Sequence, residues 1–163
     1  MVRGILVPHH TLMRDLRVVP IARAIWSRSA DRDQFTLNSL NYVYSTIEYV
    51  EDIDNQGQNE YVQMPMETVQ LGKGDCEDVA ILLVAILWAG GVYESTEVMG
   101  FVHVSHRWVR AEMSQGEFTL DPTAGTFFPT NEERERGYRA MWYVTPFSVQ
   151  PAQPGALPLF FPF

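Results

Sequence analysis

The chain has a single cysteine, Cys76, among its 163 residues, so an intrachain disulfide is impossible. Disulfides belong mainly to oxidising compartments, and we therefore expect a cytoplasmic protein. Long apolar runs are also missing. The longest, from Val79 to Val92, covers 14 residues, whereas a membrane-spanning helix needs about 20. The first ten residues are too polar for a signal peptide. We expect no membrane association.

Basic residues are scarce as well. Twelve Lys and Arg residues stand against 20 Asp and Glu residues, which gives a net charge of −8 at pH 7. The sequence pI is about 4.9. Nucleic-acid binding depends on clustered Lys and Arg side chains that neutralise phosphates, and no basic run of five residues occurs. The composition therefore argues against a nucleic-acid partner.

The hydrophobic fraction of 46% suits one domain over residues 1–163 with a substantial core. Apolar residues recur at helical spacing in 20–29 and 36–50, and Pro65 begins a shorter helical turn that ends near Leu71. Three segments rich in β-branched and aromatic residues, 97–104, 106–113 and 117–121, predict antiparallel strands with a turn at 114–116. We also expect a surface helix within 130–140 and a strand within 141–149. Helices followed by strands predict an α+β fold.

A central helix is predicted over residues 76–89. Asp75 is a suitable N-cap, and Asp78 stands three residues later, as in a capping box. Gly90 and Gly91 follow the last apolar position and should end the helix. This assignment places the thiol of Cys76 at a helix N-terminus.

The position of Cys76 has opposing effects on its reactivity. The helix dipole favours a thiolate at the N-terminus, but the neighbouring carboxylates of Asp75, Glu77 and Asp78 oppose one. We therefore expect the thiol to need a base, and histidine is the usual one.

Among the four histidines, His106 begins an alternating strand pattern, and Asp121 follows 15 residues later. With a hairpin centred near residue 115, these two positions are diagonal neighbours, roughly 7–8 Å apart. A carboxylate could then orient the imidazole. A zinc site formed by Cys76, His103, His106 and Asp121 is the less favoured alternative, because structural zinc prefers more thiolates. We expect neither a metal nor a cofactor.

Three blocks in this order resemble the transglutaminase-like cysteine peptidase superfamily. The first runs from Gly72 to Leu87 around Cys76, the second begins at His106 with the sequence His-Arg-Trp-Val-Arg-Ala-Glu, and the third is Phe-Thr-Leu-Asp-Pro-Thr around Asp121. The segment from Tyr61 to Val69 also resembles the lead-in that precedes the family's cysteine. The resemblance spans about residues 37–124.

The resemblance implies a papain-like core, with N-terminal helices and a Cys-bearing central helix packed on an antiparallel sheet. It also implies a Cys-His-Asp triad, with Cys76 as nucleophile, His106 as general base and then acid, and Asp121 as the orienting carboxylate. The reaction would pass through a thioester, with hydrolysis of a peptide or other amide as the first expectation. A protein-glutamine transglutaminase and a non-catalytic peptide-binding relative are the alternatives. Tyr61, Gln63 and Gln70 are the candidate oxyanion donors.

Three further residues are candidates for lining the substrate cleft: Arg107, Trp108 and His103. Arg107 departs from the family pattern, in which a small residue is common after the histidine. Trp108 could instead be a core residue or part of the cleft wall, and His103 a structural residue or one at the rim of the cleft. The Pro-rich tail, 145–163, ends in an apolar segment from Leu157 to Phe163 that either packs on its own domain or docks on another copy or a partner.

Overall fold

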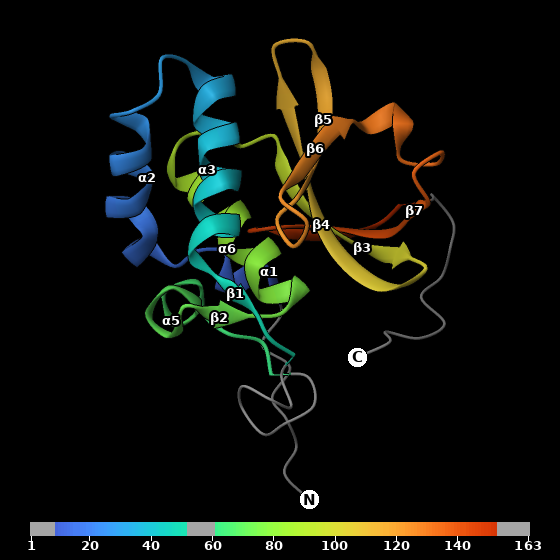
Figure 1. Ribbon diagram of the computed structural model, residues 1–163, viewed down its shortest axis with the longest axis horizontal. Helices are drawn as coiled ribbons and strands as arrows, with labels where there is room; N and C mark the ends of the chain where they lie inside the picture. Colours follow the sequence, from blue (N-terminus) through green and yellow to red (C-terminus); the bar gives the residue numbers. More distant parts are fainter. Residues whose placement is uncertain (1–8, 52–60, 153–163) are drawn as a thin grey trace, which may run out of the picture.

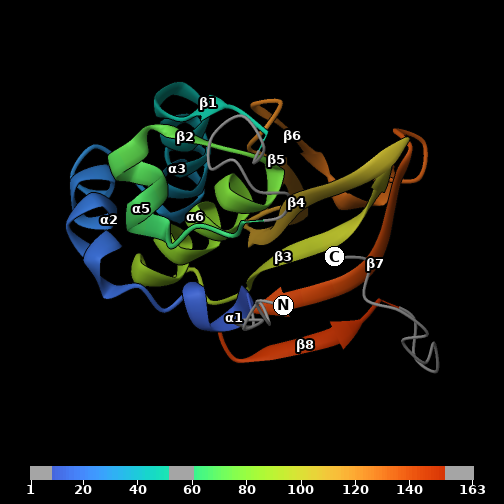
Figure 2. The same cartoon turned by 90° about the horizontal axis from the view of Figure 1, so that it is seen from below.

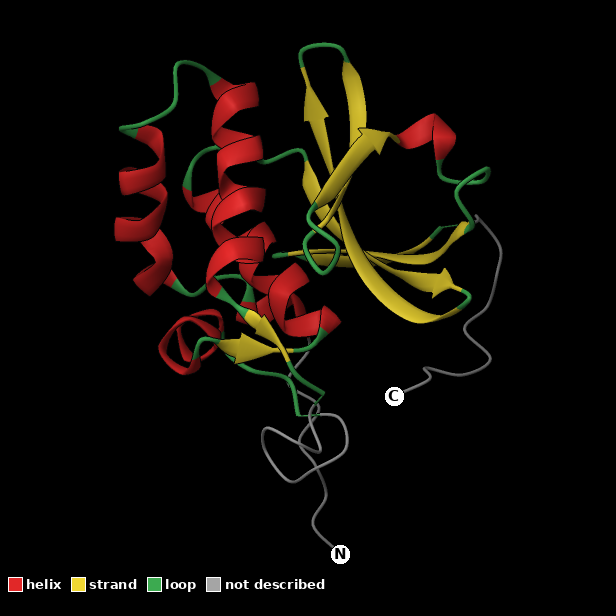
Figure 3. Ribbon diagram, in the orientation of Figure 1, coloured by secondary structure: helices red, strands yellow, loops and turns green. Residues whose placement is uncertain are grey.

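The computed structural model describes residues 9–51 and 61–152. A group of helices packs on one side of a twisted antiparallel sheet (Figure 1; Figure 3). The helices come from the first half of the chain and the sheet from the second half, as the change of periodicity predicts. The expected α+β class is therefore confirmed.

The helical part contains short and long elements. Figure 2 shows α2, α3 and α5 around α6. The elements are α1 (His9–Leu12), the 3-10 turn η1 (Leu16–Val18), α2 (Val19–Trp26), α3 (Arg32–Thr46), α5 (Pro65–Leu71) and α6 (Cys76–Ala89).

The main sheet has six strands in the order β6-β5-β4-β3-β7-β8. Its strands are β3 (Ser95–Val102), β4 (Val104–Met113), β5 (Gly116–Asp121), β6 (Thr126–Pro129), β7 (Tyr138–Thr145) and β8 (Ser148–Pro151). Every neighbouring pair is antiparallel. A separate pair, β1 (Glu48–Tyr49) and β2 (Lys73–Gly74), is parallel, and β2 comes directly before α6 in the chain.

Helix α6 forms the centre of the core. All of its residues from 78 to 87 are buried, including those on the side away from the sheet. One side contacts β3 and β4, while α2, α3 and α5 cover the others. Because it is enclosed on all sides, α6 is apolar all round rather than amphipathic. This packing fixes the helix that carries Cys76.

Two predicted elements differ from the structure. Helix α3, predicted over 36–50, begins earlier, at Arg32. The side chain of Asp31 caps it there by accepting from the backbone N–H of Gln34 at 2.8 Å. It ends at Thr46, because the next residues pair with β2. The surface helix expected within 130–140 is reduced to the 3-10 turn η2 (Thr130–Glu132). The apolar segment at 157–163 lies outside the described residues.

None of the helices in the described part of the chain combines the length and the apolar composition that a bilayer crossing requires.

Candidate active site

The capping prediction for the cysteine-bearing helix is confirmed. The carboxylate of Asp75 accepts from the backbone N–H groups of Glu77 at 3.0 Å and Asp78 at 3.3 Å. In return, the carboxylate of Asp78 accepts from the backbone N–H of Asp75 at 3.2 Å. The other oxygen of Asp78 accepts from the backbone N–H of Gln63 at 2.8 Å. This buried capping box joins the lead-in segment to the turn that presents Cys76.

The sulfur of Cys76 lies against β4. The backbone N–H and the guanidinium of Arg107, the residue directly after His106, are among the groups that act on the pKa of this thiol. Burial raises the pKa of the thiol to about 12, and the charges of Asp75 and Glu77 add to this shift. The positive charge of Arg107 and its backbone N–H act in the opposite direction without cancelling it. The thiol by itself is therefore neutral at pH 7, and attack on a carbonyl requires a base.

His106 and Asp121 meet as the hairpin register predicts. Val109 pairs with Leu120, so residue 106 is diagonal to residue 121. The imidazole Nε2 of His106 lies 2.8 Å from Oδ2 of Asp121. Because an ionised carboxylate only accepts, Nε2 carries the proton, and Nδ1 is left with the lone pair that a base needs.

Asp121 remains ionised although only 2% of its surface is exposed. Burial would raise the pKa of this carboxyl, but the hydrogen bond and charge of His106, together with the hydroxyl of Tyr138, bring it below its ordinary value. The Tyr138 hydroxyl donates to Oδ2 at 2.8 Å, and thus shares this oxygen with His106. The other oxygen, Oδ1, accepts from the backbone N–H groups of Thr123 at 3.0 Å and Ala124 at 3.3 Å. Each carboxylate oxygen therefore has two donors.

Trp108 and Arg107 are both buried, on opposite faces of β4. The Trp108 ring is fully buried, and its centroid lies 6.2 Å from that of His106 with an angle of 23° between the planes. Trp108 thus supports the imidazole from within the protein. The guanidinium of Arg107 lies between two carboxylates, 3.6 Å from Glu77 and 3.6 Å from the fully buried Glu97. His103 is exposed at the β3–β4 turn with a φ of 64°.

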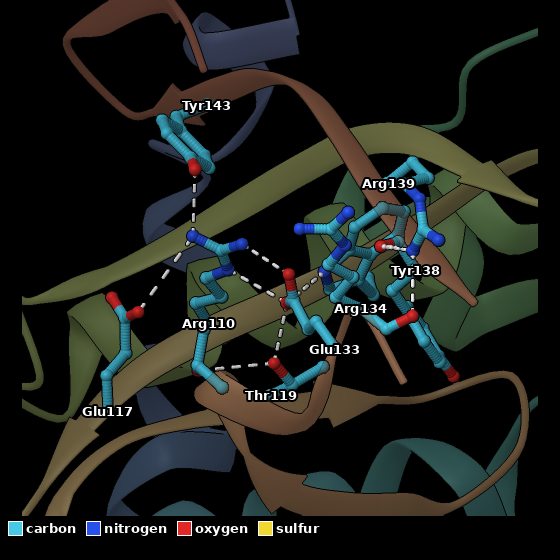
Figure 4. A network of polar contacts seen from close by, with 10 residues as sticks. Arg110, Glu117, Thr119, Glu133, Arg134, Tyr138, Arg139 and Tyr143 are labelled. Carbon is cyan, nitrogen blue, oxygen red and sulfur yellow. Dashed lines mark hydrogen bonds and ion pairs between the residues drawn. The ribbon is translucent and has the colours of Figure 1, made fainter. Parts of the chain in front are cut away.

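Another buried carboxylate, Glu133, holds the loop before β7 against the sheet. It accepts from the indole of Trp108 at 2.9 Å, from Nε of Arg110 at 2.8 Å and from the hydroxyl of Thr119 at 2.6 Å. Figure 4 shows this network, in which Arg110 also donates to the hydroxyl of Tyr143. The network anchors the start of β7, the strand that carries Tyr138.

The three oxyanion candidates lie in different surroundings. The Tyr61 hydroxyl donates to the Glu67 carboxylate at 3.0 Å. Gln70 is exposed on α5. Gln63 is fully buried, and neither atom of its side-chain amide has a hydrogen-bond partner in the described part of the protein. Gln63 is thus the only one of the three whose side-chain donor is both buried and uncommitted among the described residues.

No group of three His, Cys, Asp or Glu side chains within residues 9–51 and 61–152 is arranged to hold a metal ion.

The chain belongs to a family described as a transglutaminase-like domain, whose model matches residues 22–125. Among solved structures, EGTA-treated LapG from Legionella pneumophila is similar, with a TM-score of 0.66 and 16% identity over 86% of this chain and 87% of that one. A candidate cysteine protease from Cytophaga hutchinsonii has a TM-score of 0.63 and 16% identity over 84% of this chain and 46% of that one. No match was found among curated proteins. The family resemblance and the expected core are thereby confirmed.

Proposed function

We propose that this protein is a cysteine hydrolase that cleaves amide bonds in peptides through a thioester on Cys76. The observation that carries the proposal is the hydrogen bond from His106 to Asp121, because it orients an imidazole one residue before Arg107, whose charge acts on the pKa of the Cys76 thiol. The side chains of Cys76, His106 and Asp121 come from α6, β4 and β5, respectively. Nothing in the packing of the core itself requires an imidazole hydrogen-bonded to a buried carboxylate on the part of the sheet that contacts the Cys-bearing helix.

The first half of the reaction forms the thioester. Nδ1 of His106 takes the thiol proton as the sulfur attacks the carbonyl carbon, and the carbonyl π electrons move to oxygen. Asp121 stabilises the resulting imidazolium. We assign the backbone N–H of Cys76, in the first turn of α6, as a donor to the oxyanion. When the intermediate collapses, the C–N bond breaks and the departing amine takes the proton from His106.

The second half of the reaction restores the thiol. Water gives a proton to Nδ1 and adds to the thioester carbon, after which the C–S bond breaks. The sulfur recovers its proton from the imidazolium and the carboxylic acid leaves. Water is the simplest acceptor, because it needs no binding site of its own.

The test is intact-protein and peptide mass spectrometry after incubation with a peptide library and a primary amine, for the wild type and Cys76→Ala. Cleaved peptides that appear only with the wild type support hydrolysis. Amine-linked products that depend on Cys76 favour the transglutaminase, and binding without turnover favours the non-catalytic relative. Equal cleavage by both proteins would contradict the proposal.

A further inference from the structure

A cavity of about 330 Å³ opens beside the proposed reaction centre. Six residues line it: Tyr44, Ile47, Tyr49, Val79, Pro122 and Thr123. They come from α3, β1, α6 and the turn after β5, so the cavity lies where the helical part of the molecule meets the end of the sheet.

Three connections in the backbone bring residues of the lining close to the residues of the proposed reaction centre. Val79 stands three residues after Cys76 on α6, and side chains at that spacing are neighbours on a helix surface, with Cβ atoms about 5–6 Å apart. Tyr49 pairs with Gly74, two residues before Cys76. Pro122 directly follows Asp121. The lining is therefore connected through the backbone both to the turn that carries Cys76 and to Asp121.

The lining suits uncharged groups, and the hydroxyls of Tyr44, Tyr49 and Thr123 stand among its aliphatic and aromatic surfaces. Five of its six side chains are aromatic, aliphatic or proline, and the sixth is a threonine; none carries a formal charge at pH 7. The volume is at the lower end of ligand-binding pockets, roughly 300–1,000 Å³, and suits one large side chain rather than an extended ligand. We propose that the cavity binds an aromatic or branched aliphatic side chain of the peptide, next to the scissile bond. This assignment rests on the proposed function and names its substrate class.

The cavity is held in place by the carboxylate that orients His106. Oδ1 of Asp121 fixes the backbone of Thr123 and Ala124, and the turn ends at Gly125, which has a φ of 68°. A Cβ at Gly125 would lie only 2.7 Å from the ring of Tyr44, so the turn packs directly on that ring. Asp121 thus fixes the imidazole through one oxygen and a wall of the cavity through the other, and the pocket is preformed.

The test compares two alkylating probes on the only thiol, Cys76. N-benzyl-iodoacetamide and iodoacetamide react by the same chemistry, in which sulfur displaces iodide and the thiol proton passes to base. Each rate is measured by intact mass at pH 8.5 and divided by the rate for glutathione. If the benzyl group enters the cavity first, its normalised rate exceeds that of iodoacetamide by on the order of tenfold and saturates with concentration.

Tyr49 is an exposed residue of the lining, so the variant Tyr49→Ser removes one wall of the cavity. The variant Tyr93→Ser is its matched control. Tyr93 is also an exposed tyrosine, but it contacts Trp88 near the other end of α6. We expect the benzyl preference to fall at least threefold in Tyr49→Ser and to stay unchanged in Tyr93→Ser. Equal normalised rates for both probes in the wild type would overturn the assignment. A benzyl preference without peptide cleavage would instead keep the pocket and reject the hydrolase.

Discussion

Removal of the imidazole in the variant His106→Ala should strongly suppress the reactivity of the Cys76 thiol. Iodoacetamide reports directly on the thiolate, and Cys76 is the only cysteine in the chain, so each mass shift of one carbamidomethyl group arises at one sulfur. In the wild type, His106 can take the thiol proton and maintain an ion pair. In His106→Ala, the thiol must ionise without that base.

The structure sets the size of the effect. With the pKa of the Cys76 thiol at about 12 in the wild type, the free thiolate fraction at pH 7 is on the order of 10⁻⁵, since each unit between pH and pKa is a factor of ten. We therefore expect wild-type alkylation at this pH to depend on proton transfer to His106. We expect alkylation of His106→Ala at pH 7 to be slower than that of the wild type by on the order of 100-fold or more. Between pH 7 and pH 10 the variant's rate should rise about tenfold per unit, whereas the wild-type rate should depend less steeply on pH.

The assay is intact mass spectrometry with excess iodoacetamide over this pH range, with circular dichroism as a check on folding. Glu112→Gln is the matched control, because Glu112 is an exposed residue on the same strand and the same face as His106. It should alkylate at the wild-type rate. An equal rate at pH 7 for His106→Ala and the wild type would show that the imidazole does not act as the base for this sulfur.

Three more predictions concern the groups around the site. Tyr138→Phe removes a hydroxyl that lowers the pKa of Asp121 in the folded protein, so less stability should be lost on acidification from about pH 4 to about pH 2; an unchanged pH dependence in urea titrations would exclude this coupling. Arg107→Met removes the cation that faces buried Glu97 and should lower the free energy of unfolding by about 3 kcal/mol in urea titrations, whereas a loss under 1 kcal/mol would show that the pair contributes little. Because the pKa of Asp121 is lowered in the folded protein, its carboxylate stabilises the fold above about pH 4, and this stabilisation is lost as the pH falls through the folded pKa. The free energy of unfolding of Asp121→Asn should therefore depend less on pH between about 4 and about 2 than that of the wild type.

The parts of the site that sequence reasoning located depend on local signals. The bounds of α6 follow from a cap at Asp75 and a glycine at position 90, and the helix spans Cys76–Ala89 as the sequence predicts. The meeting of His106 with Asp121 follows from one turn position, because the register of a hairpin is set by its turn. The observed pairing of β4 with β5 has its centre between residues 114 and 115, close to the expected turn.

The parts that were missed depend on contacts between distant segments. Tyr138 reaches Asp121 from β7, which pairs with β3 rather than with β5. No local pattern reveals that strand order. The stretch 130–140 is rich in charge and suggests a solvated surface helix, yet Glu133 is only 5% exposed because Trp108 and Thr119 bind its carboxylate. Strands β1 and β2 have two residues each and are too short to show a period.

The most direct test of the central claim is acylation by N-acetyl-L-phenylalanine p-nitrophenyl ester, followed by rapid quench and intact mass spectrometry with mapping of the modified residue. We predict a transient acyl adduct on Cys76 that decays to free enzyme as the acid is released, and no adduct in Cys76→Ala. His106→Ala should form the same adduct at a much lower rate. An adduct located on another residue, or acylation of His106→Ala at the wild-type rate, would contradict the account.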